Sequence, residues 1–305
     1  VEDLDANGDA VENVSALAGV LTVTTGELVN NAGLNIALGT NSATVNADET
    51  DSAPGAETDV TINATSMGSI ETLTLTGDAE VAVDGVRGTV DAESLTGGLD
   101  VDTANNSTLT VLTGSGLTLV TAATGSDITV EADQLAVDSN PGSVTYELTV
   151  DGSGTMTVND LSADLDANAS SGVLSVNTTV DADVNIKTGS NNAFIDVNGA
   201  NGSAQIDADP MGSGIRLSAF GEGAVDIVNV ASGVIVDANG NSGLSQSALS
   251  GTLSVTTDVN VTGVIVETGV AETTVDGSGG TTEVRAAALG NDVTLNLLGS
   301  SAHTV

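Results

Sequence analysis

The residues best suited to chemistry in this sequence are aspartates and asparagines spaced two apart. The segment Asp3-Leu4-Asp5-Ala6-Asn7-Gly8-Asp9 carries oxygen-bearing side chains at its positions 1, 3, 5 and 7 around a glycine. Such a loop can wrap a hard cation, because Ca²⁺ takes about six to eight oxygen ligands in a flexible geometry. Val14 stands where an EF-hand carries its bidentate acid, so the loop is not an EF-hand.

Further acidic turns along the chain share this composition and extend the calcium hypothesis. The competing interpretation is that aspartate and asparagine are ordinary turn residues, whose side chains bond to their own backbone. Calcium is the one cofactor that the sequence suggests, and no organic cofactor is expected. The complete set of candidate calcium ligands is Asp3, Asp5, Asn7, Asp9, Asp48, Asp51, Asp59, Asp164, Asp166, Asn168, Asp181, Asp183, Asp207, Asp209, Asp237 and Asn239.

Residue types that usually carry catalysis are scarce. The sequence has no cysteine, one histidine (His303) and one lysine (Lys187). A Ser–His–Asp arrangement needs a histidine held by other parts of the fold, and His303 lies close to the end of the sequence. Carboxylate pairs occur by chance among 42 acidic residues, and no phosphate-binding or zinc-protease motif is present. The sequence therefore predicts no catalytic residues and a protein that is not an enzyme.

The net charge restricts partners and location. The formal charge is −38, from 42 acidic and four basic residues. This argues against nucleic acid and anionic membranes, which attract lysine and arginine. The self-repulsion requires bound divalent cations, high external salt, or dilution of the charge along a rod. The first two favour an extracellular or cell-surface location, or a halophilic source.

No run of about 18 apolar residues is present, and residues 1–20 show no signal peptide.

These candidate residues are positioned by a long internal repeat. A phrase of the type Ala-Leu-Ser-Gly-Thr-Leu-Ser-Val-Thr-Thr recurs with anchor leucines at Leu21, Leu99, Leu174 and Leu253, which are nearly evenly spaced. A second phrase places a glycine corner between two strands, at Gly77, Gly152, Gly221 and Gly299. Near-constant spacing is the signature of a repeat array. We predict one continuous array over 1–305, with approximate repeats 1–86, 87–161, 162–230 and 231–305.

Local patterns within each repeat indicate β-strands. Segments such as Thr72–Thr76 and Asp127–Val130 alternate aliphatic residues with threonine or aspartate, and short clusters of glycine, asparagine and serine separate them. Aromatic residues make up 1% of the sequence, whereas the thick core of a sandwich domain usually contains an aromatic anchor. A narrow solenoid bore can be filled by stacked aliphatic side chains alone. We expect an all-β, elongated parallel β-solenoid of about four degenerate repeats of ~76 residues, each with three or four coils. Tandem β-sandwich repeats are the alternative.

The two ends of the sequence are in matching phase. Within the sequence, the segment Thr155–Val158 is followed by Asp164–Asn168, and together they form a junction between repeats. The last residues, Ala302–Val305, resemble the first half of this junction, and the first residues, Val1–Asn7, resemble its second half. These residues are therefore expected to be a window on a longer array or one unit of a head-to-tail polymer. Copies of the protein itself, joined end to end or laterally, are the expected partners, and surface polysaccharide is a further candidate. Nucleic acid binding and membrane insertion are not expected.

The phrase Ala248–Thr257, together with Thr282–Leu289 and Thr294–Ser300, resembles the β-strand repeats of very large bacterial surface proteins. These are the calcium-associated adhesins of RTX type and S-layer-like proteins. The glycine-rich RTX nonapeptide itself is absent, and only fragments such as Gly277–Gly280 and Asp151–Gly154 are present. The resemblance implies a secreted, extracellular structural or adhesive role without catalysis.

Our hypothesis for the function is thus a rod, fibre or surface-layer element. Two alternatives remain open. The first is a polysaccharide-binding or polysaccharide-degrading β-helix, which an acidic cleft with an arginine among the coils would favour. The three arginines, Arg87, Arg216 and Arg285, lie far apart in the sequence. The second is a halophile surface protein, in which the charge serves hydration.

Overall fold

The computed structural model describes residues 11–13, 21–24, 34–48, 60–135, 147–240 and 247–305. Every regular element in these ranges is a β-strand, and none is a helix. All strand pairings given for them are parallel, and alternate strands along the chain belong to two different sheets. The prediction of an all-β parallel β-solenoid is confirmed. The chain divides into two compact units, Val1–Pro141 with Thr145–Met156, and Gly142–Val144 with Thr157–Val305.

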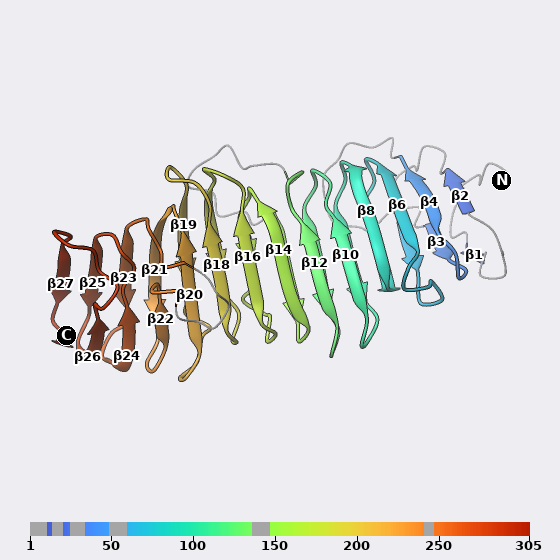
Figure 1. Cartoon of the computed structure of the whole chain (residues 1–305). Helices are drawn as coiled ribbons and strands as arrows, with labels where there is room; N and C mark the ends of the chain where they lie inside the picture. Colours follow the sequence, from blue (N-terminus) through green and yellow to red (C-terminus); the bar gives the residue numbers. More distant parts are fainter. Residues whose placement is uncertain (1–10, 14–20, 25–33, 49–59, 136–146, 241–246) are drawn as a thin grey trace. The chain divides into compact units, whose positions relative to one another are not determined.

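In the first unit the odd-numbered strands follow one another in one sheet and the even-numbered strands in the other. The even-numbered strands from β2 to β12 can be followed in Figure 1. The odd-numbered sheet contains β1 (Val11–Asn13), β3 (Leu34–Ala37), β5 (Val60–Asn63), β7 (Val81–Val86), β9 (Leu99–Thr103), β11 (Thr118–Ala122) and β13 (Leu148–Gly152). The even-numbered sheet contains β2 (Leu21–Thr24), β4 (Ala43–Ala47), β6 (Thr72–Gly77), β8 (Gly88–Leu95), β10 (Thr108–Leu112) and β12 (Asp127–Glu131). Strand β14 (Thr155–Leu161) spans the division between the units.

The second unit repeats the same arrangement. Its odd-numbered sheet contains β15 (Leu165–Asp166), β17 (Asp183–Lys187), β19 (Ser203–Asp207), β21 (Ala224–Val230), β23 (Leu253–Thr257), β25 (Thr273–Gly277) and β27 (Leu295–Gly299). Its even-numbered sheet contains β16 (Leu174–Thr178), β18 (Ala193–Val197), β20 (Arg216–Gly221), β22 (Ile235–Asp237), β24 (Val261–Glu267), β26 (Gly280–Arg285) and β28 (Ala302–Thr304).

The core is a bore filled by aliphatic side chains from both sheets. In β4, Ala43, Val45 and Ala47 are buried and the intervening Thr44 and Asn46 are partly exposed. Because the strands pair in register, Val45 lies beside Leu75 of β6, and similar residues stack from coil to coil. Fully burying one such side chain contributes about 1.5–3 kcal/mol. The alternation seen in the sequence therefore sets which face of each strand lines the bore.

The repeat corresponds to seven strands. The anchor leucines Leu21, Leu99, Leu174 and Leu253 begin β2, β9, β16 and β23, each seven strands after the last. The corner glycines Gly77, Gly152, Gly221 and Gly299 end β6, β13, β20 and β27, with the same step. Since two strands make one coil, a repeat is three and a half coils long. Within each unit, consecutive repeats therefore begin on opposite sheets.

The four corner glycines share a conformation that explains their recurrence. Each has a positive φ, from 81° at Gly299 to 110° at Gly77, where other residues are strained. A Cβ atom on any of them would also collide with a backbone carbonyl oxygen of the preceding coil. The second repeated phrase thus marks corners at which backbone approaches backbone.

Candidate functional site

The calcium candidates fall into three groups. Asp3, Asp5, Asn7, Asp9, Asp51 and Asp59 lie outside the described residues. Asp48 follows β4 and accepts a hydrogen bond from Asn46 Nδ2 at 2.8 Å. The remaining candidates lie at coil corners and strand ends of the second unit, where two kinds of hydrogen bond involve them.

The first kind is a local turn two residues long. Asp166 Oδ1 accepts from the backbone N–H of Asn168 at 2.9 Å. Asp207 Oδ1 accepts in the same way from Asp209, and Asp237 Oδ1 from Asn239, each at 3.1 Å. These turns account for the two-residue spacing of the acidic motifs, as the competing interpretation proposes.

The second kind joins neighbouring coils. Asp164 accepts from both the backbone N–H and the side-chain amide of Asn185, at 2.7 and 2.9 Å. Asp181 accepts from the same two groups of Asn201, at 3.1 and 3.3 Å. Asp183 accepts from the hydroxyl of Ser203 at 2.6 Å. Each partner lies about one coil further along the chain, so these carboxylates link successive coils.

The structure thus distributes the described calcium candidates along the coils. In the described residues, no group of three or more histidine, cysteine, aspartate or glutamate side chains is arranged to hold a metal ion. Lys187, the single lysine, lies 3.9 Å from Asp166 Oδ2. His303 lies on β28, and its Nε2 is 2.9 Å from the carbonyl oxygen of Leu298.

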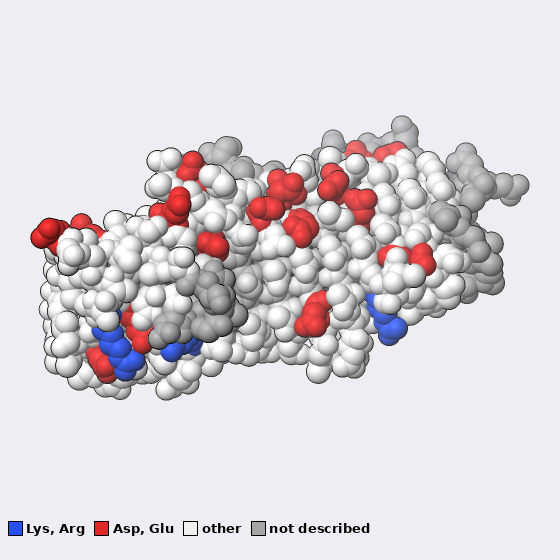
Figure 2. Space-filling model, viewed as in Figure 1, with Lys and Arg blue, Asp and Glu red and all other residues white. Residues whose placement is uncertain are grey.

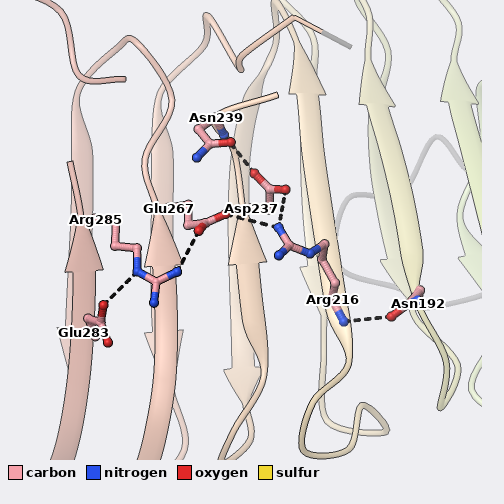
Figure 3. A network of polar contacts seen from close by, with 7 residues as sticks. All are labelled: Asn192, Arg216, Asp237, Asn239, Glu267, Glu283 and Arg285. Atoms are coloured by element: carbon pink, nitrogen blue, oxygen red, sulfur yellow. Dashed lines mark hydrogen bonds and ion pairs between the residues drawn. The ribbon is translucent and has the colours of Figure 1, made fainter. Parts of the chain in front are cut away.

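A further polar cluster, of which sequence reasoning proposed only Asp237 as a ligand, lies on the even-numbered sheet of the second unit (Figure 3). Arg216 of β20 binds Asp237 of β22 and, at 3.1 Å, Glu267 of β24 through Nη1. The other oxygen of Glu267 binds Arg285 Nη1 of β26 at 3.0 Å. Arg285 Nε completes the row by binding Glu283 at 2.7 Å. We call these five residues the arginine ladder.

The ladder is built on strand register. Asp237 pairs with Glu267, and Glu267 with Arg285, directly across neighbouring strands. The side chain of Asp237 is 1% exposed and that of Glu267 is 10% exposed, whereas those of Arg216 and Arg285 are 32% and 47% exposed. The arginine stems therefore cover two buried carboxylates. A buried charge that lost its partner would be strongly destabilising, by about 3–5 kcal/mol.

An unpaired polar group and both phenylalanines lie beside the ladder. Ser218 pairs in register with Asp237 and with Phe194, and its hydroxyl is buried without a hydrogen-bond partner. Phe220 is 5% exposed and pairs with Asp196. Burial raises the pKa of Asp196 above its usual value. This face of the sheet is thus partly withdrawn from water at Ser218, Phe220 and Asp196.

The ladder brings two carboxylates close together without making them accessible. Asp237 and Glu267 both bind Arg216 Nη1, so the two carboxylates meet at one guanidinium nitrogen. Retaining glycosidases also use two neighbouring carboxylates, about 5–5.5 Å apart. Both carboxylates are buried and bonded to guanidinium groups. In this structure both carboxylates bind guanidinium groups of neighbouring coils.

The charged side chains at the surface are mainly acidic, as the composition of the sequence predicts. Acidic side chains are spread over the face seen in Figure 2, and basic ones occupy few places. The described part of the chain contains no helix with the length and apolarity needed to cross a membrane. Comparison with known proteins finds no family model, no curated protein and no solved structure that matches the chain.

Proposed function

We propose that this protein is a non-catalytic extracellular structural element that forms a rod, fibre or surface layer. The proposal rests on the hydrogen bonds and ion pairs that the acidic side chains make between coils. The aspartates of the corners and the carboxylates of the arginine ladder bind groups on neighbouring coils, as in the pairs Asp164–Asn185 and Glu267–Arg285. Side chains committed to holding coils together favour a mechanical role.

Assembly with copies of itself is part of this proposal. In the coil formed by β27 and β28, Leu298 is 50% exposed, and Leu295 and Leu297 of the bore are only half-buried. Residues 286–305 contain a single carboxylate, Asp292, and neither lysine nor arginine. Edge strands that stay separate are usually guarded by charge. Strands β27 and β28 have little such guarding and suit pairing with a further coil of the same kind, either from a continuation of the chain or from another copy of the protein.

The extracellular location rests on the charge of −38, which bound calcium or high salt would compensate. Calcium binding remains part of the proposal for the loops at Asp3–Asp9 and Asp48–Asp59. Thermal melting in EDTA, in millimolar calcium and in molar sodium chloride shows whether bound calcium or high salt compensates the negative charge. Stabilisation by calcium alone supports bound ions, and stabilisation by any salt supports the halophile alternative.

A polysaccharide-binding role is the second candidate, because Arg216 and Arg285 meet at Glu267 although they lie far apart in the sequence. Both guanidinium groups are partly exposed and could bind an acidic sugar. Binding of a uronic acid polymer by wild type, with loss of binding in Arg285→Gln, would favour this function. Equal binding of the polymer by wild type and Arg285→Gln, or no binding by either protein, would count against it.

The structural proposal is tested by negative-stain electron microscopy over a concentration series. We expect filaments or sheets from wild type, and shorter or no assemblies from Leu298→Lys, because a charge at the edge opposes strand pairing. Val259→Lys is the matched control, since Val259 is 72% exposed at a corner away from that edge. Compact single particles from wild type at all concentrations would refute the assembly.

A further inference from the structure

A groove of about 300 Å³ lies on the outer side of the odd-numbered sheet in the first unit. Its floor includes Asp100 of β9, Leu119 of β11 and Thr149 of β13, which stand side by side in register. Leu117, at the corner before β11, forms one wall and is 58% exposed. The groove therefore combines Leu117 and Leu119 with two acidic residues, Asp100 and Glu80.

The gap exists because a side chain is missing from one coil. Gly98 lies between Glu80 of one neighbouring coil and Leu117 of the other. A Cβ atom on Gly98 would lie 3.5 Å from Glu80 Cγ and 3.8 Å from the carbonyl oxygen of Leu117. The backbone at Gly98 is bonded to both coils, by Val81 N–H donating to Gly98 O and Leu99 N–H donating to Leu117 O. The groove is thus held open by paired backbone.

Among the described residues, no lysine or arginine lines the groove. The carboxylate of Asp100 makes no ion pair or hydrogen bond with the described part of the chain. Asp102 lies two residues further along the same strand and pairs in register with Asp84, so three carboxylates gather on neighbouring strands. Arg87 is the one lysine or arginine in the sequence of this unit. Loss of hydration raises the pKa of Asp100, and repulsion from Asp102 and Asp84 raises it further.

We propose that this groove binds a basic peptide segment of a partner protein, with a lysine or arginine head group on Asp100 and its neighbouring apolar side chain against Leu117 and Leu119. Such side chains carry a hydrocarbon stem beneath the charge, which matches a groove that has leucines beside a carboxylate. The inference concerns the first unit and does not depend on the structural role proposed above.

The test uses a fluorescein-labelled pentapeptide that alternates leucine and lysine, with binding followed by fluorescence anisotropy at physiological salt. We expect Asp100→Asn and Leu117→Ser each to weaken binding by about fivefold, which corresponds to the loss of one modest contact. Asp127→Asn, on an exposed residue of β12, removes the same charge elsewhere and is expected to change binding by less than about twofold. Circular dichroism checks that each variant is folded.

Three further measurements keep the proposal falsifiable. Thr149→Lys places a cation inside the groove and is expected to abolish peptide binding without removing any residue of the core. A serine–lysine pentapeptide of equal charge is expected to bind at least about fivefold more weakly than the leucine–lysine peptide. Equal losses in Asp100→Asn and Asp127→Asn, or equal binding of both peptides, would show attraction by diffuse charge and overturn the proposal. Displacement of the peptide by spermine from wild type and Leu117→Ser alike would overturn it in favour of a polyamine.

Discussion

Asn260 Oδ1 lies 2.7 Å from the position that a Cβ atom would occupy at Gly279, one coil further along the chain. Both residues have positive φ, 60° at Asn260 and 99° at Gly279. The same relationship joins Asn106 to Gly125 in the first unit. A left-handed asparagine in one coil thus packs on a left-handed glycine in the next, and the missing side chain lets the two corners approach.

Gly279→Ala is expected to lower the free energy of unfolding by about 2 kcal/mol or more, because positive φ costs about 1–2 kcal/mol and the collision with Asn260 adds to it. Gly214 has a φ of 83° but no atom near the position that a Cβ would occupy, so Gly214→Ala should show the backbone cost alone, about 1 kcal/mol. Gly212, which is unstrained and open, provides the neutral control. Urea unfolding measures all three, and equal losses at Gly279 and Gly214 would show that the packing on Asn260 contributes nothing.

Glu267 links two arginines, and its replacement tests the arginine ladder. Glu267→Gln should lower the free energy of unfolding by about 3 kcal/mol, because Arg216 and Arg285 lose a buried partner. Glu283→Gln removes an ion pair whose carboxylate is 48% exposed and should cost less than about 1 kcal/mol. Chemical denaturation at low and high salt measures both. A cost at Glu267 no larger than at Glu283 would contradict the structural importance of the ladder.

Asp181 separates the hydrogen-bonding interpretation of the acidic corners from the calcium interpretation. It has a φ of 60° and accepts two hydrogen bonds from Asn201. Asp181→Asn should cost little, since asparagine tolerates this conformation and its amide oxygen can keep one of the two exposed hydrogen bonds from Asn201. Asp181→Ala should cost about 1–2 kcal/mol. The difference between melting in calcium and in EDTA should be the same for Asp181→Asn as for wild type; a smaller difference in the variant would assign the ion to this corner.

The pKa of Asp100 predicts a pH dependence. Because it is raised above the usual 3.8, the folded state binds the proton more tightly than the unfolded state. Ionisation of Asp100 therefore lowers stability as pH rises through the interval above 3.8. Asp100→Asn should raise the melting temperature at pH 7 and leave it unchanged at pH 3, where both states are protonated. Asp127→Asn controls for the general effect of one fewer negative charge, and an equal rise in both variants would contradict the local origin.

Much of the fold follows from residue types. Alternating strands, the shortage of aromatic residues and the recurring leucines predict a solenoid, and the structure contains one. The change of sheet between Leu21 and Leu99 could not be anticipated from their spacing alone. It follows from an odd number of strands per repeat, and strand boundaries in coils of unequal length are uncertain from sequence.

The arginine ladder was hidden for the same reason. Its residues follow one another at unequal intervals in the sequence, so no periodic motif marks them. Their contact depends on register between coils, which turns of different lengths obscure. The Asp164–Asn185 pair was easier to suspect, because acidic corners are visible locally, although the hydrogen bonds from asparagine became visible only in the structure.

The central claim is that this chain builds a structural assembly by stacking coils, and cryo-electron microscopy of the concentrated protein tests it most directly. We predict filaments or ordered layers with a repeat of about 4.8 Å along the stacking direction, the spacing of neighbouring β-strands. We also predict that Leu298→Lys removes them and Val259→Lys does not. Separate single particles for all three proteins, or assemblies that Leu298→Lys leaves intact, would contradict it.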